Sequence, residues 1–451
     1  MRLLCVLRVA LRPLRSLSLL TAVVAATALY AQSPLTPGAR YREYVWTTPA
    51  DGEPFLRVGG RLGYANTPGK FPRELQDGDE LILPDSLALD GAVAATVTLE
   101  RVASHEDTRD LRISVNGQPP IAIPEPAAVP APQPDYMYHT DVEVAVPLEQ
   151  LRPGRGNRFA LSVDTAQRWG WPQNIFYAVT WRVYYDLGDD GAEPARDDPR
   201  VAYPYTQVPA RSTLMLANPA PGDSLVDYVF VGRAVDWSGR GIADRKHYQT
   251  YRGEPHHTIG RSNDPTHAFA KTWDAAWLPE QDTPEELLAD SAVAGANTFG
   301  VQARALGGNG VWRVGPVLDG LTLAPRDYAV HLLTSEPAPP NWVTRADTFE
   351  QAFALPFGLD RVTAYRLAWT SWSPCYANGL SLNGHLLWLR DGPCYAWATN
   401  EPTFDDEHAL DYLQAGRNVL HTGLTPLMRG GEMVHGMEVQ WPGVQVVVRV
   451  E

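Results

Sequence analysis

Short apolar runs separated by turn residues dominate the hydrophobic pattern of this chain. Apolar and polar residues alternate in Val142-Glu-Val-Ala-Val146, as expected of a half-buried strand. Gly, Pro, Asn and Asp separate the runs, and long helical periodicity is nearly absent, with short helices predicted only at Thr283–Asp290 and Asp405–Gln414. We therefore predict an all-β protein. Its clearest strands are expected at Ala94–Val102, Leu111–Val115, Val142–Val146, Phe176–Tyr185, Val226–Val231, Val362–Trp369 and Val444–Val450.

One phrase of the sequence occurs twice. An apolar run ending in Asn116-Gly117 is followed by Leu151-Arg-Pro-Gly-Arg-Gly-Asn157 and another apolar run, and Asn383-Gly384 is followed in the same way by Leu413-Gln-Ala-Gly-Arg-Asn418. Asn-Gly suits the two positive-φ positions of a type I′ hairpin turn. In the turn that ends at Asn157 or Asn418, Gly permits a left-handed conformation and the Asn side chain can bond nearby backbone groups at the start of the next strand. The repeat therefore predicts two copies of one β-module.

This combination of turns resembles the galactose-binding-like jelly roll, a fold found in carbohydrate-binding modules and in sugar-binding domains of glycoside hydrolases. The resemblance rests on short motifs and implies a scaffold more than a ligand, because the same fold also serves as a structural spacer.

Two linkers divide the chain into three predicted regions. The N-terminal jelly roll is expected over residues 40–187, followed by an acidic linker at 188–204. A middle region over 205–325 resembles an immunoglobulin-like β-sandwich in size and strand content. The second jelly roll is expected over 341–451, after a Pro-rich linker.

The first 31 residues have the features of a signal peptide. A basic segment containing Arg2 and Arg15 precedes an apolar run of about a dozen residues, against the ~20 that a membrane-spanning helix needs, and small residues follow it. We therefore expect a secreted protein, extracellular or periplasmic, without membrane insertion after signal removal. The formal net charge of −14 argues against nucleic acid as a partner.

Cys375 and Cys394 flank the second Asn-Gly hairpin, and Cys5 lies in the signal peptide. In an oxidising compartment the two are expected to form a disulfide worth about 3 kcal/mol by loop closure. A catalytic thiol is the weaker alternative, because neither cysteine has a nearby histidine.

Candidate chemistry gathers in polar segments. The candidate zinc or copper ligands of the middle region are His247, His256, His257 and His267. The alternative is that these histidines are solvent-exposed loop residues without a ligand role. His105 and Asp107 are weak catalytic candidates, as are His256 and His257, and the loop around Asp107 could instead hold a structural calcium ion. Neither a catalytic residue nor a cofactor follows firmly from these patterns.

The aromatic residues supply the strongest binding argument. The chain has 14 tryptophans, a high count, and several occur among polar or turn residues. Tryptophan is also a favoured core residue of β-sandwiches, so core packing is the alternative for each of them. Sugar rings can stack on such side chains while nearby polar groups bind their hydroxyls. The candidate ligand-binding residues are Trp169, Trp171, Trp273, Trp277 and Trp372.

These patterns predict a secreted protein that binds a polysaccharide or glycan through loops bearing tryptophan. One alternative is a polysaccharide- or glycan-active enzyme, a hydrolase or lyase with or without a metal ion. The other is a structural or adhesive surface protein.

Overall fold

The computed structural model describes residues 35–47, 56–58, 74–75, 80–83, 85–104, 111–124, 137–162, 174–189, 191–236, 241–245, 249–251, 254–256, 259–279, 299–333, 335–336, 349–372, 379–388, 397–422, 427–429, 432–434, 438–439 and 444–451. Over these residues the protein is built almost entirely of antiparallel β-sheets, which confirms the predicted all-β sandwich class. The helical content of the described residues is one turn of α-helix, α2 (Glu407–Leu410), and three 3-10 turns. None of the described helices is long and apolar enough to cross a membrane.

The first sandwich contains two sheets that enclose one apolar core. One sheet has the order β1 (Arg40–Thr47), β10 (Asn174–Asp186), β5 (Ala94–Ser104) and β8 (Met137–Ala145). The other has the order β4 (Glu80–Ile82), β9 (Arg158–Ser162), β6 (Arg112–Val115) and β7 (Ile121–Ala122). Val97, Leu99, Val179 and Trp181 of the first sheet pack against Phe159 and its neighbours, because alternate residues of each strand face inward.

The C-terminal sandwich repeats this strand order. One sheet runs β22 (Ala329–Leu333), β34 (Gln445–Val450), β25 (Val362–Trp372) and β28 (Trp397–Asn400). The other runs β24 (Phe349–Leu355), β30 (Gly416–Thr422), β26 (Leu380–Leu382) and β27 (His385–Trp388), with β23 (Ser335–Glu336) beside β24. Short strands β29 (Thr403–Phe404) and β33 (Glu438–Val439) also pair with β25. The chain therefore uses one strand arrangement twice, as the repeated phrase predicts.

The repeated phrase forms the same hydrogen-bond network in both sandwiches. Asn116 and Asn383 each have a φ of 51° and precede a glycine with positive φ, as the predicted type I′ turn requires. The Nδ2 of Asn116 donates to the Oδ1 of Asn157 at 2.9 Å, and the Nδ2 of Asn383 donates to the Oδ1 of Asn418 at 2.8 Å. The hydrogen bond between the two asparagines thus holds each Asn-Gly turn against the loop that carries Asn157 or Asn418.

The second asparagine of each pair is buried and fully bonded. The Nδ2 of Asn418 donates to the carbonyl oxygens of Gln414 and Gly416, and its Oδ1 also accepts from the Gln414 backbone N–H. Asn157 makes the equivalent bonds with Arg152 and Gly154. An amide that uses both its donors and its acceptor in a buried site specifies one loop conformation.

The middle region is a third sandwich. The larger sheet contains β15 (Gly241–Arg245), β14 (Leu225–Asp236), β20 (Phe299–Leu306) and β21 (Trp312–Leu323), with β18 (Gly260–Ser262) and β12 (Gln207–Val208) at its margins. The smaller sheet contains β11 (Val201–Ala202), β13 (Arg211–Leu216) and β19 (Lys271–Asp274). Val226, Tyr228 and Phe269 lie in the core between the two sheets. Strands β2 (Leu56–Val58) and β3 (Glu74–Leu75) extend the first sandwich's sheet beside β10. Two separate hairpin pairs are β16 (Gln249–Tyr251) with β17 (Glu254–His256) and β31 (Leu427–Arg429) with β32 (Glu432–Val434).

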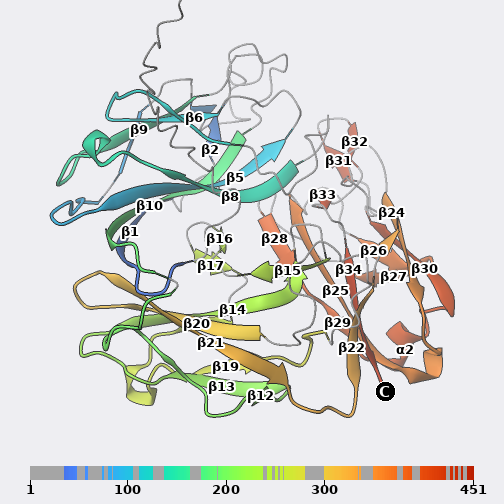
Figure 1. Ribbon diagram of the computed structural model, residues 1–451. Helices are drawn as coiled ribbons and strands as arrows, with labels where there is room; N and C mark the ends of the chain where they lie inside the picture. Colours follow the sequence, from blue (N-terminus) through green and yellow to red (C-terminus); the bar gives the residue numbers. More distant parts are fainter. Residues whose placement is uncertain are drawn as a thin grey trace, which may run out of the picture.

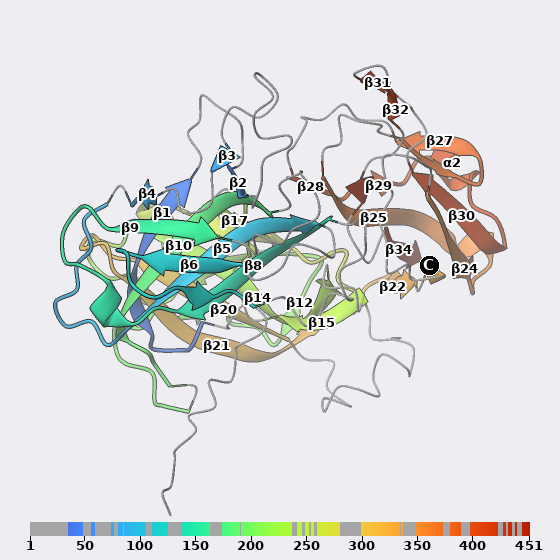
Figure 2. The ribbon, with the colours of Figure 1, turned by 90° about the horizontal axis from the view of Figure 1, so that it is seen from above.

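Strand β1 joins the first sandwich to the middle one. It pairs with β10 along its length and with β21 at its start, where Arg40 faces Arg313 and Tyr41 faces Trp312 (Figure 1). One continuous sheet therefore contributes to both sandwiches, while the C-terminal strands lie to one side of them (Figure 2). The limits of the three predicted domains stay predictions, because a shared sheet does not define where a folding unit begins or ends.

Charged side chains are buried along this shared sheet. Arg304, which is 1% exposed, donates from Nε to Asp227 at 2.9 Å and from Nη1 to Glu43 at 3.2 Å. Arg182 donates from Nε to the same Glu43 oxygen at 2.9 Å, and Arg261 donates to Asp227 at 2.6 Å. Burial would raise the pKa of Glu43, but the charges and hydrogen bonds of Arg304 and Arg182 outweigh it and lower the pKa to about 2.

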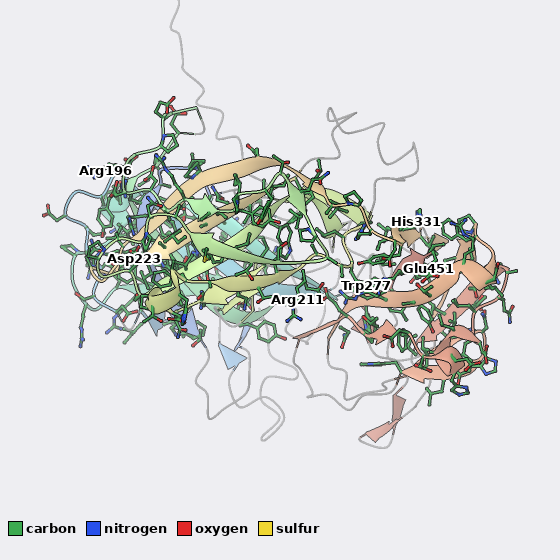
Figure 3. The ribbon with its side chains drawn as sticks, turned by 90° about the horizontal axis from the view of Figure 1, so that it is seen from below. Arg196, Arg211, Asp223, Trp277, His331 and Glu451 are labelled. Atoms are coloured by element: carbon green, nitrogen blue, oxygen red, sulfur yellow. The ribbon has the colours of Figure 1, made fainter. Side chains whose placement is uncertain are left out.

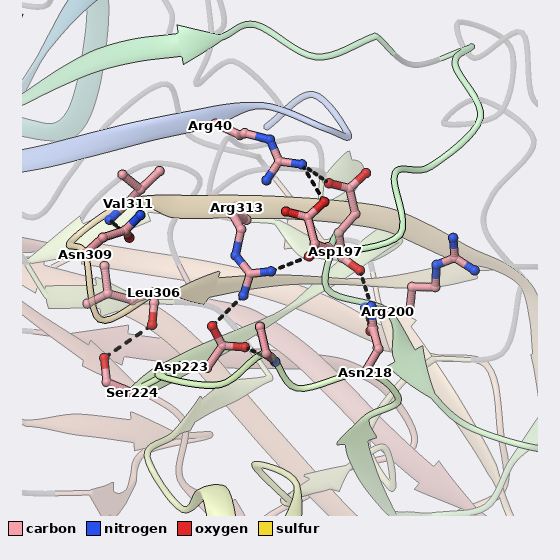
Figure 4. Close-up of polar contacts among 12 residues, drawn as sticks. Arg40, Asp197, Arg200, Asn218, Asp223, Ser224, Leu306, Asn309, Val311 and Arg313 are labelled. Atoms are coloured by element: carbon pink, nitrogen blue, oxygen red, sulfur yellow. Dashed lines mark hydrogen bonds and ion pairs between the residues drawn. The ribbon is translucent and has the colours of Figure 1, made fainter. Parts of the chain in front are cut away.

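The acidic linker is held against the sheet by arginines (Figure 4). Arg313 donates to a carboxylate oxygen of Asp223 and to the backbone carbonyl of Asp197. Arg40 donates to Asp197 and Asp198 at 3.1 and 2.9 Å, and Asn218 donates to the Asp198 carbonyl at 2.7 Å. The linker is thus a docked part of the fold.

Candidate functional site

Several predicted site residues cannot be placed. The residues that lie outside the described ranges are His105, Asp107, Trp169, Trp171, His247, His257, Cys375 and Cys394. His256 ends strand β17 and Trp372 ends strand β25, and for both the structure describes the backbone alone. The catalytic, metal and disulfide roles of these residues therefore stay predictions.

His267 lies in a local surface turn. Its Nδ1 contacts the Oδ2 of Asp264 at 2.6 Å, while Asp264 also accepts from the hydroxyl and backbone N–H of Thr266. Hydrogen bonds from Thr266 and then His267 lower the pKa of Asp264 to about 2. Among the described residues no three His, Cys, Asp or Glu side chains come together as a metal site. These contacts account for His267 as a turn-stabilising residue.

Trp273 lies in the core of the middle sandwich. It is 5% exposed and packs against Phe230 and Phe299, with ring centroids 6.1 and 5.7 Å away. A ring enclosed in this way has no face for a ligand, so the structure assigns Trp273 to core packing instead of the predicted binding platform.

Trp277 is placed by the loop that follows β19. The side chain of Asp274 accepts from the backbone N–H of Ala276 at 3.0 Å and so starts a turn. Arg326 then donates to the carbonyl oxygens of Ala276 and Leu278 at 3.3 and 3.2 Å. These bonds hold the backbone on both sides of Trp277, whose side chain is half-buried.

Two arginines of the C-terminal sandwich meet this indole. The guanidinium carbon of Arg366 (β25) lies 4.6 Å from the centroid of the Trp277 ring, and that of Arg449 (β34) lies 4.5 Å from it. Arg449 also lies 4.3 Å from the Tyr328 ring, on which Arg326 stacks at 5.0 Å. We call these five residues, Trp277, Arg326, Tyr328, Arg366 and Arg449, the Trp277 cluster.

Strand register explains why the two arginines point the same way. Val447 of β34 pairs with Arg366 of β25, and Arg449 pairs with Ala364, so Arg366 and Arg449 are diagonal neighbours on one sheet face. The alternate residues of β34 on the other face, among them Val446 and Val448, pack in the sandwich core. Trp277 lies between the strands of the middle region and this C-terminal sheet (Figure 3).

The cluster is positively charged and partly shielded from water. Burial lowers the pKa of Arg366, the carboxylates of Glu401 and Asp274 oppose that effect, and the like charge of Arg449 adds to it. Arg366 also donates from Nε to the hydroxyl of Thr403 at 2.9 Å. The arrangement places aromatic surface beside several guanidinium donors, which can bind hydroxyl or anionic oxygens.

An exposed aromatic cluster at the second Asn-Gly turn lies apart from this site. His385 stacks on Tyr412 with centroids 4.5 Å apart and planes inclined by 4°, and the Oη of Tyr412 is 2.6 Å from the Nε2 of His408. In the first copy, Gln118 stands at the position of His385 and Gln150 stands at the position of Tyr412. Comparison of the two copies could have identified this difference from the sequence.

The arginines and Tyr328 of the Trp277 cluster were not predicted as site residues. Arg366 and Arg449 occupy polar positions within otherwise apolar strands, a pattern that most outward-facing strand positions share. Their proximity depends on the pairing of β25 with β34 and on the docking of a loop from another region.

Comparisons with known proteins do not assign this chain to a family. No family model matches it, and no curated protein matches it. Among solved structures, it is similar to a beta-porphyranase of glycoside hydrolase family 86 from the human gut bacterium Bacteroides plebeius, at 10% identity and a TM-score of 0.19 over 57% of this chain and 37% of that one. It is also similar to the plant receptor-like kinase FER, at 9% identity and a TM-score of 0.18 over 88% and 96% of the two chains. The chain thus spans just over a third of the length of the first of these.

Proposed function

We propose that this protein is exported and binds a polysaccharide or glycan through the Trp277 cluster, on a scaffold of two galactose-binding-like jelly rolls flanking an immunoglobulin-like sandwich. The observation that carries the proposal is the fixed, half-buried Trp277 beside Tyr328, Arg366 and Arg449. Aromatic surface combined with a few oriented polar groups suits a sugar, whose C–H faces are apolar and whose hydroxyls need partners.

The rigidity of the Trp277 loop supports a binding role. Asp274 and Arg326 fix the backbone on both sides of the indole, so a ligand would pay little entropy to order it. The likeness of the two jelly-roll scaffolds supports the architecture: their strand orders agree, and their paired asparagines make equivalent bonds.

Binding of the full chain to a glycan array, followed by calorimetry on the best ligand, tests the proposal. Trp277→Ala is expected to weaken binding about five- to thirtyfold, because lost stacking is worth roughly 1–2 kcal/mol. Tyr205→Ala is the matched control, since Tyr205 is a 66% exposed aromatic that contacts Tyr203 and lies outside the cluster.

Two results would overturn the proposal. One is the absence of binding to every glycan on the array, which would favour a structural or adhesive role. The other is a bound glycan whose affinity is unchanged in a folded Trp277→Ala variant. Release of smaller sugars during the incubation would instead indicate the catalytic alternative.

A further inference from the structure

The three arginines of the Trp277 cluster differ in the partners that the described residues offer to their charges. Arg326 uses its guanidinium on the carbonyl oxygens of the Trp277 loop. The carboxylates of Glu401 and Asp274 raise the pKa of Arg366 and so favour its charged form. Arg449 has two ring contacts, but within the described part of the chain it forms no ion pair, and its Nε is buried without a hydrogen-bond partner.

This arrangement is unfavourable for the protein alone. Two guanidinium groups lie within 4.6 Å of one indole centroid, so their positive charges are close, and burial removes part of the water that would screen them. A buried donor without a partner also carries a cost of its own. Both costs would fall if an anionic oxygen pair approached Arg449 and Arg366.

Guanidinium groups are well matched to such a ligand. Their planar N–H fork binds a carboxylate or a sulfate ester through two parallel hydrogen bonds, which an uncharged hydroxyl cannot reproduce. The adjacent aromatic rings of Trp277 and Tyr328 favour an anion carried on a sugar ring over a free inorganic ion.

We propose that the Trp277 cluster selects acidic polysaccharides, with Arg449 and Arg366 binding a carboxylate or sulfate group and the aromatic rings contacting the sugar that carries it. This inference rests on the proposed glycan-binding function and adds the class of glycan. The chain has a net charge of −14, so the whole protein repels an acidic polymer and the selectivity must come from local arginines.

Matched pairs of polymers test the inference. The full chain is titrated with polygalacturonate and its methyl ester, and with a sulfated galactan and its desulfated form, at 20 and 200 mM salt. We expect at least one acidic polymer to bind about tenfold more tightly than its neutral partner, and salt to weaken that binding severalfold because the contact is partly electrostatic. The two pairs distinguish carboxylate from sulfate.

Variants locate the effect. Arg449→Met should bring the affinity for the acidic polymer down to that for the neutral one, whereas Arg449→Lys should retain part of the preference because it keeps the charge and loses the planar fork. Arg417→Met is the control, since Arg417 is a 65% exposed arginine on the same sandwich, paired with Glu350 at 3.4 Å. Thermal unfolding of each variant shows whether it is folded.

The outcomes separate the two proposals. Equal affinity for acidic and neutral polymers, with Trp277→Ala still reducing both, would overturn the acidic selectivity and leave glycan binding standing. An acidic preference that survives in folded Arg449→Met and Arg449→Lys variants would overturn the role of Arg449. Loss of all glycan binding in the wild-type chain would overturn both proposals.

Discussion

Replacement of Glu43 by glutamine should destabilise the junction between the first and middle sandwiches in a pH-dependent way. The Glu43 carboxylate accepts from Arg182 at 2.9 Å and from Arg304 at 3.2 Å, and its side chain is 14% exposed. These arginines lower the pKa of Glu43 from 4.5 to about 2. Each unit of pKa shift corresponds to roughly 1.36 kcal/mol, so ionisation of Glu43 adds about 3 kcal/mol to the free energy of unfolding at neutral pH.

The sign of the pH dependence follows from the lowered pKa. The contribution is fully present above pH 4.5, the pKa of an unperturbed glutamate, and is lost as the pH falls toward about 2. Glu43→Gln removes the charge at every pH and leaves Arg182 and Arg304 buried without it. We therefore expect the variant to unfold about 3 kcal/mol more easily at pH 7 and only about 1 kcal/mol more easily at pH 3.

Urea unfolding of both proteins at pH 7 and pH 3, followed by tryptophan fluorescence, measures these differences. Glu350→Gln is the matched control: its side chain is 52% exposed and pairs with Arg417 and His421 at the surface, so we expect a change within about 0.5 kcal/mol. The reasoning would be refuted if Glu43→Gln behaved like this control at pH 7, or if its deficit were equally large at pH 3.

Two further predictions concern the turn network and the docked linker. Asn418→Asp keeps the shape of the side chain but places a buried carboxylate against the carbonyl oxygens that accept from the Asn418 amide in the wild type. Thermal unfolding should therefore show that the free energy of unfolding falls by about 2 kcal/mol or more at pH 7, and that this loss shrinks below pH 4. An unchanged melting temperature at pH 7 would contradict the network. Arg313→Met removes the contacts that hold Asp197 and Asp223, so hydrogen exchange over residues 191–200 should accelerate, whereas the exposed-site control Arg196→Met should leave it unchanged.

Local chemistry made the sandwiches predictable from the sequence. Asn116-Gly117 and Asn383-Gly384 demand positive φ at adjacent positions, and both pairs adopt it. The strand ranges followed from runs such as Val444–Val450, whose alternate residues Val446, Val448 and Val450 enter the core. In each case the signal lies within a few residues, where steric preference and hydrophobic alternation act directly.

Long-range contacts were not predictable in the same way. Glu43, Arg182, Asp227 and Arg304 each look like an outward-facing polar residue of a strand. In the structure Arg182, Asp227 and Arg304 are buried and Glu43 is half-buried, and they bond to one another from four different strands. Trp277 illustrates the same limit for the site. Its loop suggested a ligand platform, but its charged neighbours come from strands close to 90 and 170 residues further along the chain.

The central claim is that a glycan occupies the Trp277 cluster. Hydroxyl-radical footprinting of the full chain, read by mass spectrometry with and without the tightest-binding acidic polysaccharide, tests it most directly. We predict that oxidation of Trp277 and Tyr328 falls severalfold on binding, while oxidation of the exposed Tyr205 is unchanged. A polysaccharide that binds the protein and leaves the oxidation of Trp277 at its unbound level would contradict the account.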